Sequence, residues 1–341
     1  MENNASNILP HTSRTIYTTC TPRTRERKRF SLGITTEPAD DDDVPIDILS
    51  ELLSQTWNIY GVSTLFNFYQ DEVHLKQYAK RLREEVAGTL TQQDVTYSAK
   101  FLVMENITVR PHPADPPPIK VEVYAKNISN EESCVEKCIY KGIFLSWRTI
   151  QNELTIANSI RLPLLLCRGT QSGMRTVHNI LGRMFDCMAI TLPAHEDDLI
   201  WLVTIIITPT NREEQPKGTD EILMQYKIPE LPDTDTIVVK FKMLDLIKIL
   251  TVIINDQSNE ASNEISLHLD HIEKFRNVLY TQMLESAGLQ LGLCTLHKIQ
   301  LPALTIMGNR IKVTKLDTMN RVLLYLNEKA LDTFHTINFE V

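Results

Sequence analysis

The chain has 341 residues, of which 43 % are hydrophobic and 23 % charged, values typical of a globular protein with a buried core. Its 35 Lys and Arg residues are outnumbered by 43 Asp and Glu residues, so the formal net charge is −8. This balance excludes a uniformly basic nucleic-acid binder, although it allows a local basic patch. The 11 glycines form neither a GxGxxG nor a GxxxxGK[ST] motif, which argues against a phosphate-cradling nucleotide site.

The N-terminal region, residues 1–43, reads as a disordered tail because it is polar and poor in large apolar residues. It carries an acidic run at 40–43 and a compact basic cluster formed by Arg23, Arg25, Arg27, Lys28 and Arg29. Such a cluster predicts a nuclear-import signal, and a phosphate-contacting arm or a merely solvated charge run are the alternatives. The polar N-terminus shows no secretion signal, so we expect reduced cysteines in a cytosolic or nuclear protein.

Residues 44–88 are predicted to form a small helical unit. Apolar residues from Ile46 to Trp57 recur every three to four positions, and Leu75 and Leu82 belong to a second helical stripe. Basic residues occupy the other faces of this second helix. They are Lys76, Lys80, Arg81 and Arg83.

Residues 89–215 are predicted to be a first α+β part. β-Branched and aromatic residues predict strands at 99–109, 119–126, 138–147, 162–167, 188–192 and 200–208, with a helix at 172–187. The apolar segment 199–208 is shorter than the ~20 residues of a membrane-spanning helix, so we read it as a buried strand and expect no membrane association.

Residues 216–341 are predicted to be a second α+β part. Strands are expected at 222–228 and 236–242, helices at 243–254, 264–286 and 317–331, and a terminal strand at 336–341. A hairpin of 296–306 and 310–315 is expected around Gly308 and Asn309. The elements interleave without regular βαβ spacing, which predicts an α+β fold with mainly antiparallel sheets.

The residues that could carry chemistry do not form a convincing site. Cys134 and Cys138 lack a second pair of zinc ligands, and His268 and His271 lack a third ligand. Ser172 is outside any GxSxG elbow. We therefore predict no metal, no cofactor and no enzymatic activity.

Three segments together resemble a known family. The first contains Trp57, Tyr60, Leu65, Phe66, Phe68, Leu75, Lys76, Tyr78 and Leu82. The second contains Leu162 to Leu166, Gly169, Ser172 and Phe185 to Cys187, and the third contains Ile311, Lys312 and Val322 to Leu326. In this order and spacing they resemble the centromere protein L family, whose members are subunits of the constitutive inner-kinetochore network.

The resemblance implies a nuclear, centromere-bound assembly protein with curved antiparallel sheets that pairs with a centromere protein N-like subunit. It also implies contact with other inner-kinetochore subunits and with centromeric chromatin or DNA. The partner is expected mainly on the C-terminal half, which fits the addition of strands to a sheet edge. The candidate edges are 310–315 and 336–341, with Ile311, Val313, Ile337 and Phe339 as partner contacts; internal strands are the alternative.

Two basic groups are candidates for contact with DNA. One is formed by Lys76, Lys80, Arg81 and Arg83, and the other by Arg310, Lys312 and Lys315. Each would act through counterion release, so binding would be independent of sequence and sensitive to salt. The alternative function is a homo-oligomeric, sequence-independent DNA clamp in chromatin or recombination.

Overall fold

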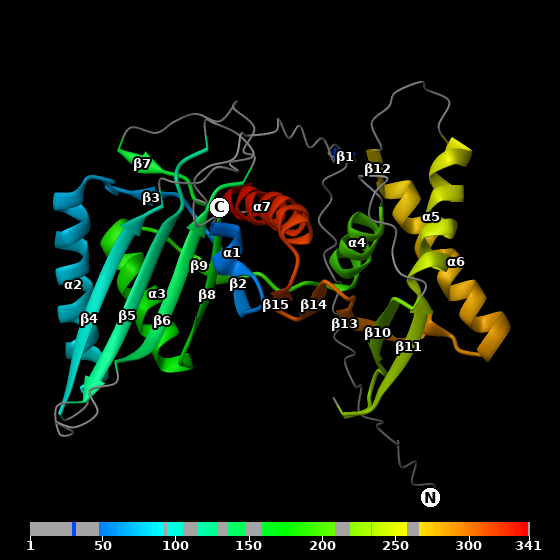
Figure 1. Cartoon of the computed structure of the whole chain (residues 1–341), viewed down its shortest axis with the longest axis horizontal. Coiled ribbons are helices and arrows are strands. Elements are labelled where there is room, and N and C mark those ends of the chain that lie inside the picture. The colour runs from blue at the N-terminus through cyan, green and yellow to red at the C-terminus, as the bar shows by residue number, and fades with distance from the viewer. Residues whose placement is uncertain are drawn as a thin grey trace, which may run out of the picture.

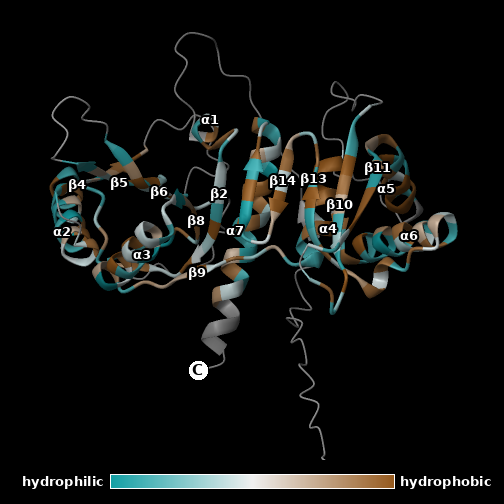
Figure 2. Ribbon diagram, turned by 90° about the horizontal axis from the view of Figure 1, so that it is seen from below, coloured by the Kyte–Doolittle hydropathy of each residue, from teal (hydrophilic) through white to brown (hydrophobic). Residues whose placement is uncertain are grey.

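The structure is a computed structural model. It describes residues 29–31, 48–91, 94–104, 115–127, 136–147, 158–208, 219–232, 234–257 and 266–339. Its centre is an 11-stranded antiparallel sheet that runs the width of the molecule (Figure 1, Figure 2).

The order of pairing in this sheet differs from the order along the chain. From one end to the other the strands are β11 (Thr236–Lys242), β10 (Glu221–Lys227), β13 (Thr295–Gln300), β14 (Leu304–Met307), β15 (Arg310–Val313), β2 (Thr56–Val62), β8 (Leu164–Gly169), β6 (Lys137–Leu145), β5 (Ile119–Asn127) and β4 (Val95–Val103). A short strand, β9 (Ala189–Thr191), also pairs with β2. Two small sheets pair β1 (Arg29–Ser31) with β12 (Ser266–His268), and β3 (Leu65–Phe66) with β7 (Ser159–Ile160).

Two surfaces of the main sheet can be followed from strand to strand, because residues that face each other across a ladder point to the same side. Face A contains Trp57 and its partner Ile311, and it continues to Met224. Face B contains Asn58 and its partner Arg310, and it continues to Lys298.

The helices surround this sheet. They are α1 (Ile48–Leu52), α2 (Glu72–Leu90), α3 (Gln171–Phe185), α4 (Glu196–Ile207), α5 (Met243–Gln257), α6 (Leu269–Ala287) and α7 (Leu316–Phe339), with a short 3-10 turn at Leu291–Leu293. Figure 1 shows α2 and α3 beside strands β4 to β8, α5 and α6 at the other end, and α7 between the two groups.

Each group of helices buries a different face of the sheet. Under α2 and α3 lies a cluster that includes Val121 and Leu165 on face B. A second cluster joins α1, α4, α5, α6 and α7 to face A, where it includes Trp57 and Ile299. Strands β2, β8 and β6 contribute buried residues to both clusters, so the junction between the clusters spans these three strands.

The α+β class with antiparallel, unclosed sheets is confirmed, as are most of the predicted elements. The hairpin around Gly308 and Asn309 joins β14 to β15, and Gly308 adopts the left-handed conformation that such a turn favours (φ 57°). The predicted strand 296–306 is divided into β13 and β14 by a tight turn at Leu301, whose N–H donates to the Leu304 carbonyl over 2.7 Å.

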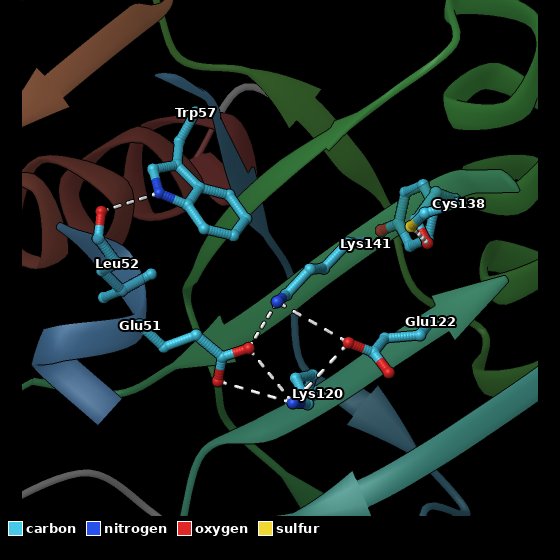
Figure 3. A network of polar contacts seen from close by, with 8 residues as sticks. Glu51, Leu52, Trp57, Lys120, Glu122, Cys138 and Lys141 are labelled. Carbon is cyan, nitrogen blue, oxygen red and sulfur yellow. Dashed lines mark hydrogen bonds and ion pairs between the residues drawn. The ribbon is translucent and has the colours of Figure 1, made fainter. Parts of the chain in front are cut away.

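The prediction of a helical unit at 44–88 is wrong in its first part. Helix α1 ends at Leu52, and Trp57 lies in the central strand β2. Trp57 and Ile59 alternate with the half-buried Asn58 and Tyr60, but Trp57 also continues the apolar spacing of α1, and this spacing imitated a helical stripe. The indole N–H of Trp57 donates to the Leu52 carbonyl over 2.9 Å, which fixes the turn between the two elements (Figure 3).

The predicted strand at 200–208 is also wrong, because these residues form most of helix α4. Helix α4 is buried around most of its circumference, so its apolar run lacks an amphipathic pattern. The Asp198 carboxylate accepts a 2.7 Å hydrogen bond from the His195 N–H at the N-terminus. At the other end, the Arg321 guanidinium donates to the carbonyls of Ile205 (3.1 Å) and Thr208 (2.8 Å).

Candidate functional site

The strand predicted as a partner-binding edge is internal. Strand β15 pairs with β14 on one side and with β2 on the other. Ile311 and Val313 are 2 % and 0 % exposed and belong to the core of face A. The prediction of an edge at 310–315 is therefore wrong, since both sides of the ladder are already occupied within the chain.

The predicted terminal strand at 336–341 is wrong as well. Helix α7 continues through Phe339, so Ile337 and Phe339 are helical, and their side chains lie outside the described part of the structure. Among the described strands, the two ends of the main sheet are β11 and β4. Only β11 lies in the C-terminal half where the partner was expected.

The first basic group lies on α2, at the β4 end of the sheet, and most of its charges have local partners. Lys76 pairs with Glu72 (2.6 Å) and Arg81 with Glu85 (2.8 Å) along the helix. Arg83 lies 3.7 Å from Glu84, and Lys80 is exposed. The structure does not bring this group together with Arg310 and Lys312, which lie in β15 at the middle of the sheet, or with Lys315, which lies between β15 and α7.

The second basic group is part of a larger surface on face B. In one row across the strands, Lys240 is followed by Leu223, Gln300, Thr305 and Lys312. The next row contains Val238, Gln225, Lys298, Met307 and Arg310. We call the cationic members of these strands the basic face: Lys227, Lys240, Lys242, Lys298, Arg310 and Lys312.

The basic face is accessible. Val238 is 51 % exposed and Met307 43 % exposed, and none of the described helices packs on this side of β10 to β15. Among the strand positions described on this side, Glu221 is the acidic residue, and its carboxylate lies 3.8 Å from the Lys240 ammonium. Lys240 and Lys312 are four strands apart, roughly 19 Å at ~4.8 Å per strand. The charges therefore suit an extended anion better than a single phosphate.

A shallow hollow of about 260 Å³ lies within this surface. Leu223, Thr305 and Lys312 line it together with the turn between β13 and β14. Sequence reasoning found Arg310 and Lys312 but missed Lys227, Lys240, Lys242 and Lys298. Locally the sequence shows only Lys240 and Lys242 two positions apart and single lysines at 227 and 298, and these become a patch only when the strand order is known.

On face A at the other end of the sheet, a partly buried ion cluster holds α1 in place (Figure 3). The Glu51 carboxylate contacts the Lys141 ammonium and the Lys120 ammonium, the latter at 3.1 Å. Glu122 lies 3.6 Å from Lys120 and 3.7 Å from Lys141. Burial raises the pKa of Glu51, but the hydrogen bonds and charges of both lysines outweigh it, and the net shift is downward. The cluster is an anchor for α1.

The residues considered as metal ligands or nucleophiles do not form a catalytic or metal site in the described part of the chain. The Nδ1 atom of His271 accepts a hydrogen bond from the His268 N–H (3.2 Å) at the start of α6, and His271 is buried. Ser172 is exposed in the first turn of α3, and Cys134 lies outside the described residues. Within the described ranges, no three His, Cys, Asp or Glu side chains come together as a metal site.

Of the predicted import cluster, Arg23, Arg25, Arg27 and Lys28 lie outside the described residues, and Arg29 begins strand β1. Among the helices that the structure describes, none combines the length and the apolarity needed to cross a bilayer.

Broad charged sheet surfaces and unpaired edge strands are features of proteins that bind other macromolecules. The family model for centromere protein L matches residues 51–331. The chain therefore belongs to the centromere protein L family, which gives it a structural role at the centromere and kinetochore of the nucleus and partners within the inner kinetochore. No curated protein matches the chain.

The structure explains why one residue of the family resemblance, Gly169, is a glycine. Gly169 ends β8 with a φ of 154°, and a Cβ built there would lie 2.2 Å from the Ile139 carbonyl oxygen. Residue 169 must therefore be glycine for the end of β8 to lie so close to the backbone of β6.

Proposed function

We propose that this chain is a non-enzymatic subunit of the constitutive inner-kinetochore network that pairs with a centromere protein N-like partner and holds duplex DNA against the basic face. The observation that carries the DNA part is the basic face itself, a concentrated positive surface on a chain with net charge −8. Because side chains of a flat sheet reach phosphates more readily than base edges in a groove, binding would be independent of sequence.

The pairing is proposed at β11, the sheet end in the C-terminal half. An added strand would receive ladder hydrogen bonds there and would continue the sheet. Two exposed apolar side chains, Val238 (51 %) in the strand and Leu231 (50 %) in the preceding turn, would be covered by such a partner. The proposed partner-binding strand is therefore β11, at the end of the sheet, and not the internal strand β15.

The DNA part is tested by measuring the affinity for a non-specific duplex over a range of salt concentrations, with the chain alone and with its partner. The triple variant K240E/K298E/K312E should bind more weakly, and its plot of log affinity against log salt should be flatter by about 3 units, roughly 0.9 per lost phosphate contact. The matched control is K76E/K80E/R83E on α2, which should change neither quantity much. Equal losses in both variants would contradict the assignment to the basic face.

The pairing is tested by affinity purification of the tagged chain from mitotic nuclei followed by mass spectrometry. A centromere protein N-like subunit should be recovered in stoichiometric amount with the wild type and lost with Val238→Asp. The control is Val73→Asp, which alters another exposed valine (63 %) on α2. Recovery of the chain alone, or self-association on DNA, would favour the alternative of a homo-oligomeric clamp.

A further inference from the structure

The end of the main sheet far from β11 is a long and regular edge. Strand β4 pairs with β5 through nine consecutive residue pairs, from Val95–Asn127 to Val103–Ile119, without a bulge. It contains no proline, and in the described part of the chain no strand pairs with its outer side. Natural proteins usually interrupt or shorten such an edge, because its free N–H and C=O groups recruit further strands.

An apolar groove runs along this edge on face B. It has a volume of about 450 Å³ and lies between β4 and α2. Leu75 and Ala79 of α2 form the apolar part of one wall, and Ala99, Phe101 and Val103 of β4 form the apolar part of the other. The rim is polar on the helix side, with Gln70, Glu72 and Lys76, and is completed on the strand side by Lys100 and Leu102. The side chains of an added strand that point to face B would enter this groove, so they should be apolar.

On face A the same edge has the opposite character. Lys100 is exposed, with its ammonium 5.9 Å from the centre of the Tyr124 ring, and Leu102 is 43 % exposed. On the neighbouring strand Lys120, Glu122 and Lys126 point to the same face, with Glu122 as the ladder partner of Lys100. The Glu122 carboxylate lies beside Lys120 and Lys141 in the cluster described above. Residues of an added strand that oppose Lys100 would therefore be acidic, because opposite charges are favoured across a ladder.

We propose that the β4 edge is a docking site for an extended segment of a partner protein whose residues alternate between apolar and acidic. The segment adds as a strand to β4, with its apolar side chains in the groove beside Leu75 and Ala79 and its carboxylates beside Lys100. This site is separate from β11 and from the basic face, so it gives the protein a second protein-binding end.

The probe is a fluorescent synthetic peptide of about ten residues, enough to span β4, in which valine and glutamate alternate. Two comparison peptides have the same length: one groups the valines and glutamates in two blocks, and one replaces every glutamate by lysine. The full-length chain should bind the alternating acidic peptide about tenfold more tightly than either comparison peptide. Hydrogen exchange of the β4 amides should slow on binding, while that of the β11 amides should not.

Lys100→Glu should weaken binding of the acidic peptide about tenfold and strengthen binding of the lysine peptide. Ala79→Glu should weaken binding by filling the groove. Lys80→Glu is the matched control, because Lys80 is an exposed lysine on α2 that does not line the groove, and it should have no effect. Undetectable binding to the wild type, equal binding of the block peptide, or an equal loss in the Lys80 variant would overturn the proposal.

Discussion

The two halves of the sheet are built from the same kind of alternating strand but are covered on opposite faces. In β5, the apolar positions Ile119, Val121 and Val123 point to face B, under α2 and α3. In β10, Ile222 and Met224 point to face A, towards α4 and the other helices of the second cluster. At the two ends of the sheet the opposite face is therefore the more open one, and it carries the exposed Lys100 on β4 and the exposed Lys240 on β11.

The helices cover opposite faces of the sheet in the two halves, and the face that they leave uncovered determines where each half can bind a partner. A one-residue shift in the apolar alternation exchanges the covered and the open side of a strand. The chain makes this exchange across β2, β8 and β6, which contribute buried residues to both clusters, and so one continuous sheet can expose lysines on opposite faces at its two ends.

The largest loss of stability is expected when one buried phenylalanine in each cluster is replaced by alanine. Phe185 under face B and Phe275 under face A are 1 % and 0 % exposed. We expect Phe185→Ala and Phe275→Ala each to lower the free energy of unfolding by about 3–5 kcal/mol, measured by denaturant titration. Because both clusters share β2, each variant should retain a single transition. Two separate transitions would show that the halves unfold independently.

A pH effect should distinguish the N-terminal half. Burial between α3 and the sheet lowers the pKa of His178 to about 4, and its Nε2 atom has no hydrogen-bond partner among the described residues. Since the unfolded chain binds this proton near pH 6.5, the contribution of the neutral imidazole is complete above that pH and is lost as the pH falls towards 4. About 3 kcal/mol should disappear over this window. The decline should be smaller in His178→Phe, and an identical pH profile would contradict the assignment.

A smaller loss is expected at the anchor of α1. Glu51→Gln removes the carboxylate that holds Lys120 and Lys141 together, so two partly buried ammonium groups retain only Glu122. The expected loss is about 2 kcal/mol, measured by thermal and urea denaturation at pH 7. The loss should vanish well below the normal carboxylate pKa, where Glu51 of the wild type is also protonated. A loss that persists there would point to packing instead of charge.

The smallest effects are expected on the two open faces. Lys240→Ala and Lys100→Ala change exposed side chains on opposite sides of the sheet. Each should alter the free energy of unfolding by less than about 0.5 kcal/mol, measured by denaturant titration. A larger loss at either position would mean that the face is a packed surface of the isolated chain.

Most single elements could be predicted from local patterns, because their residues alternate or repeat with a clear period. The errors have local causes. Helix α4 is buried around most of its circumference, so the period that distinguishes a helix from a strand is weak there, and Trp57 of β2 continues the apolar spacing of the preceding helix. The end of α7 was taken for a strand because β-branched and aromatic residues at 336–339 outweighed the helix that precedes them.

The candidate sites depended on strand order, which the sequence does not contain. Arg310 and Lys312 could be named as a basic pair from the sequence, but their neighbours Lys240 and Lys298 come from strands far along the chain. The edge assignment failed for the same reason: nothing local to Ile311 reveals that β2, from a segment about 250 residues earlier, closes its free side.

The position of α7 has a mechanical consequence. A load applied between β11 and β4 would cross every ladder of the sheet in series, in the direction that peels strands apart one hydrogen bond at a time. Helix α7 contacts β15, β2 and β8 as well as α1 and α4, so it spans the middle ladders in parallel with them. Beside β2, the ring of Phe334 lies 3.1 Å from the Cβ position of Gly61. The helix thus acts as a brace across the part of the sheet where the two halves would otherwise separate first.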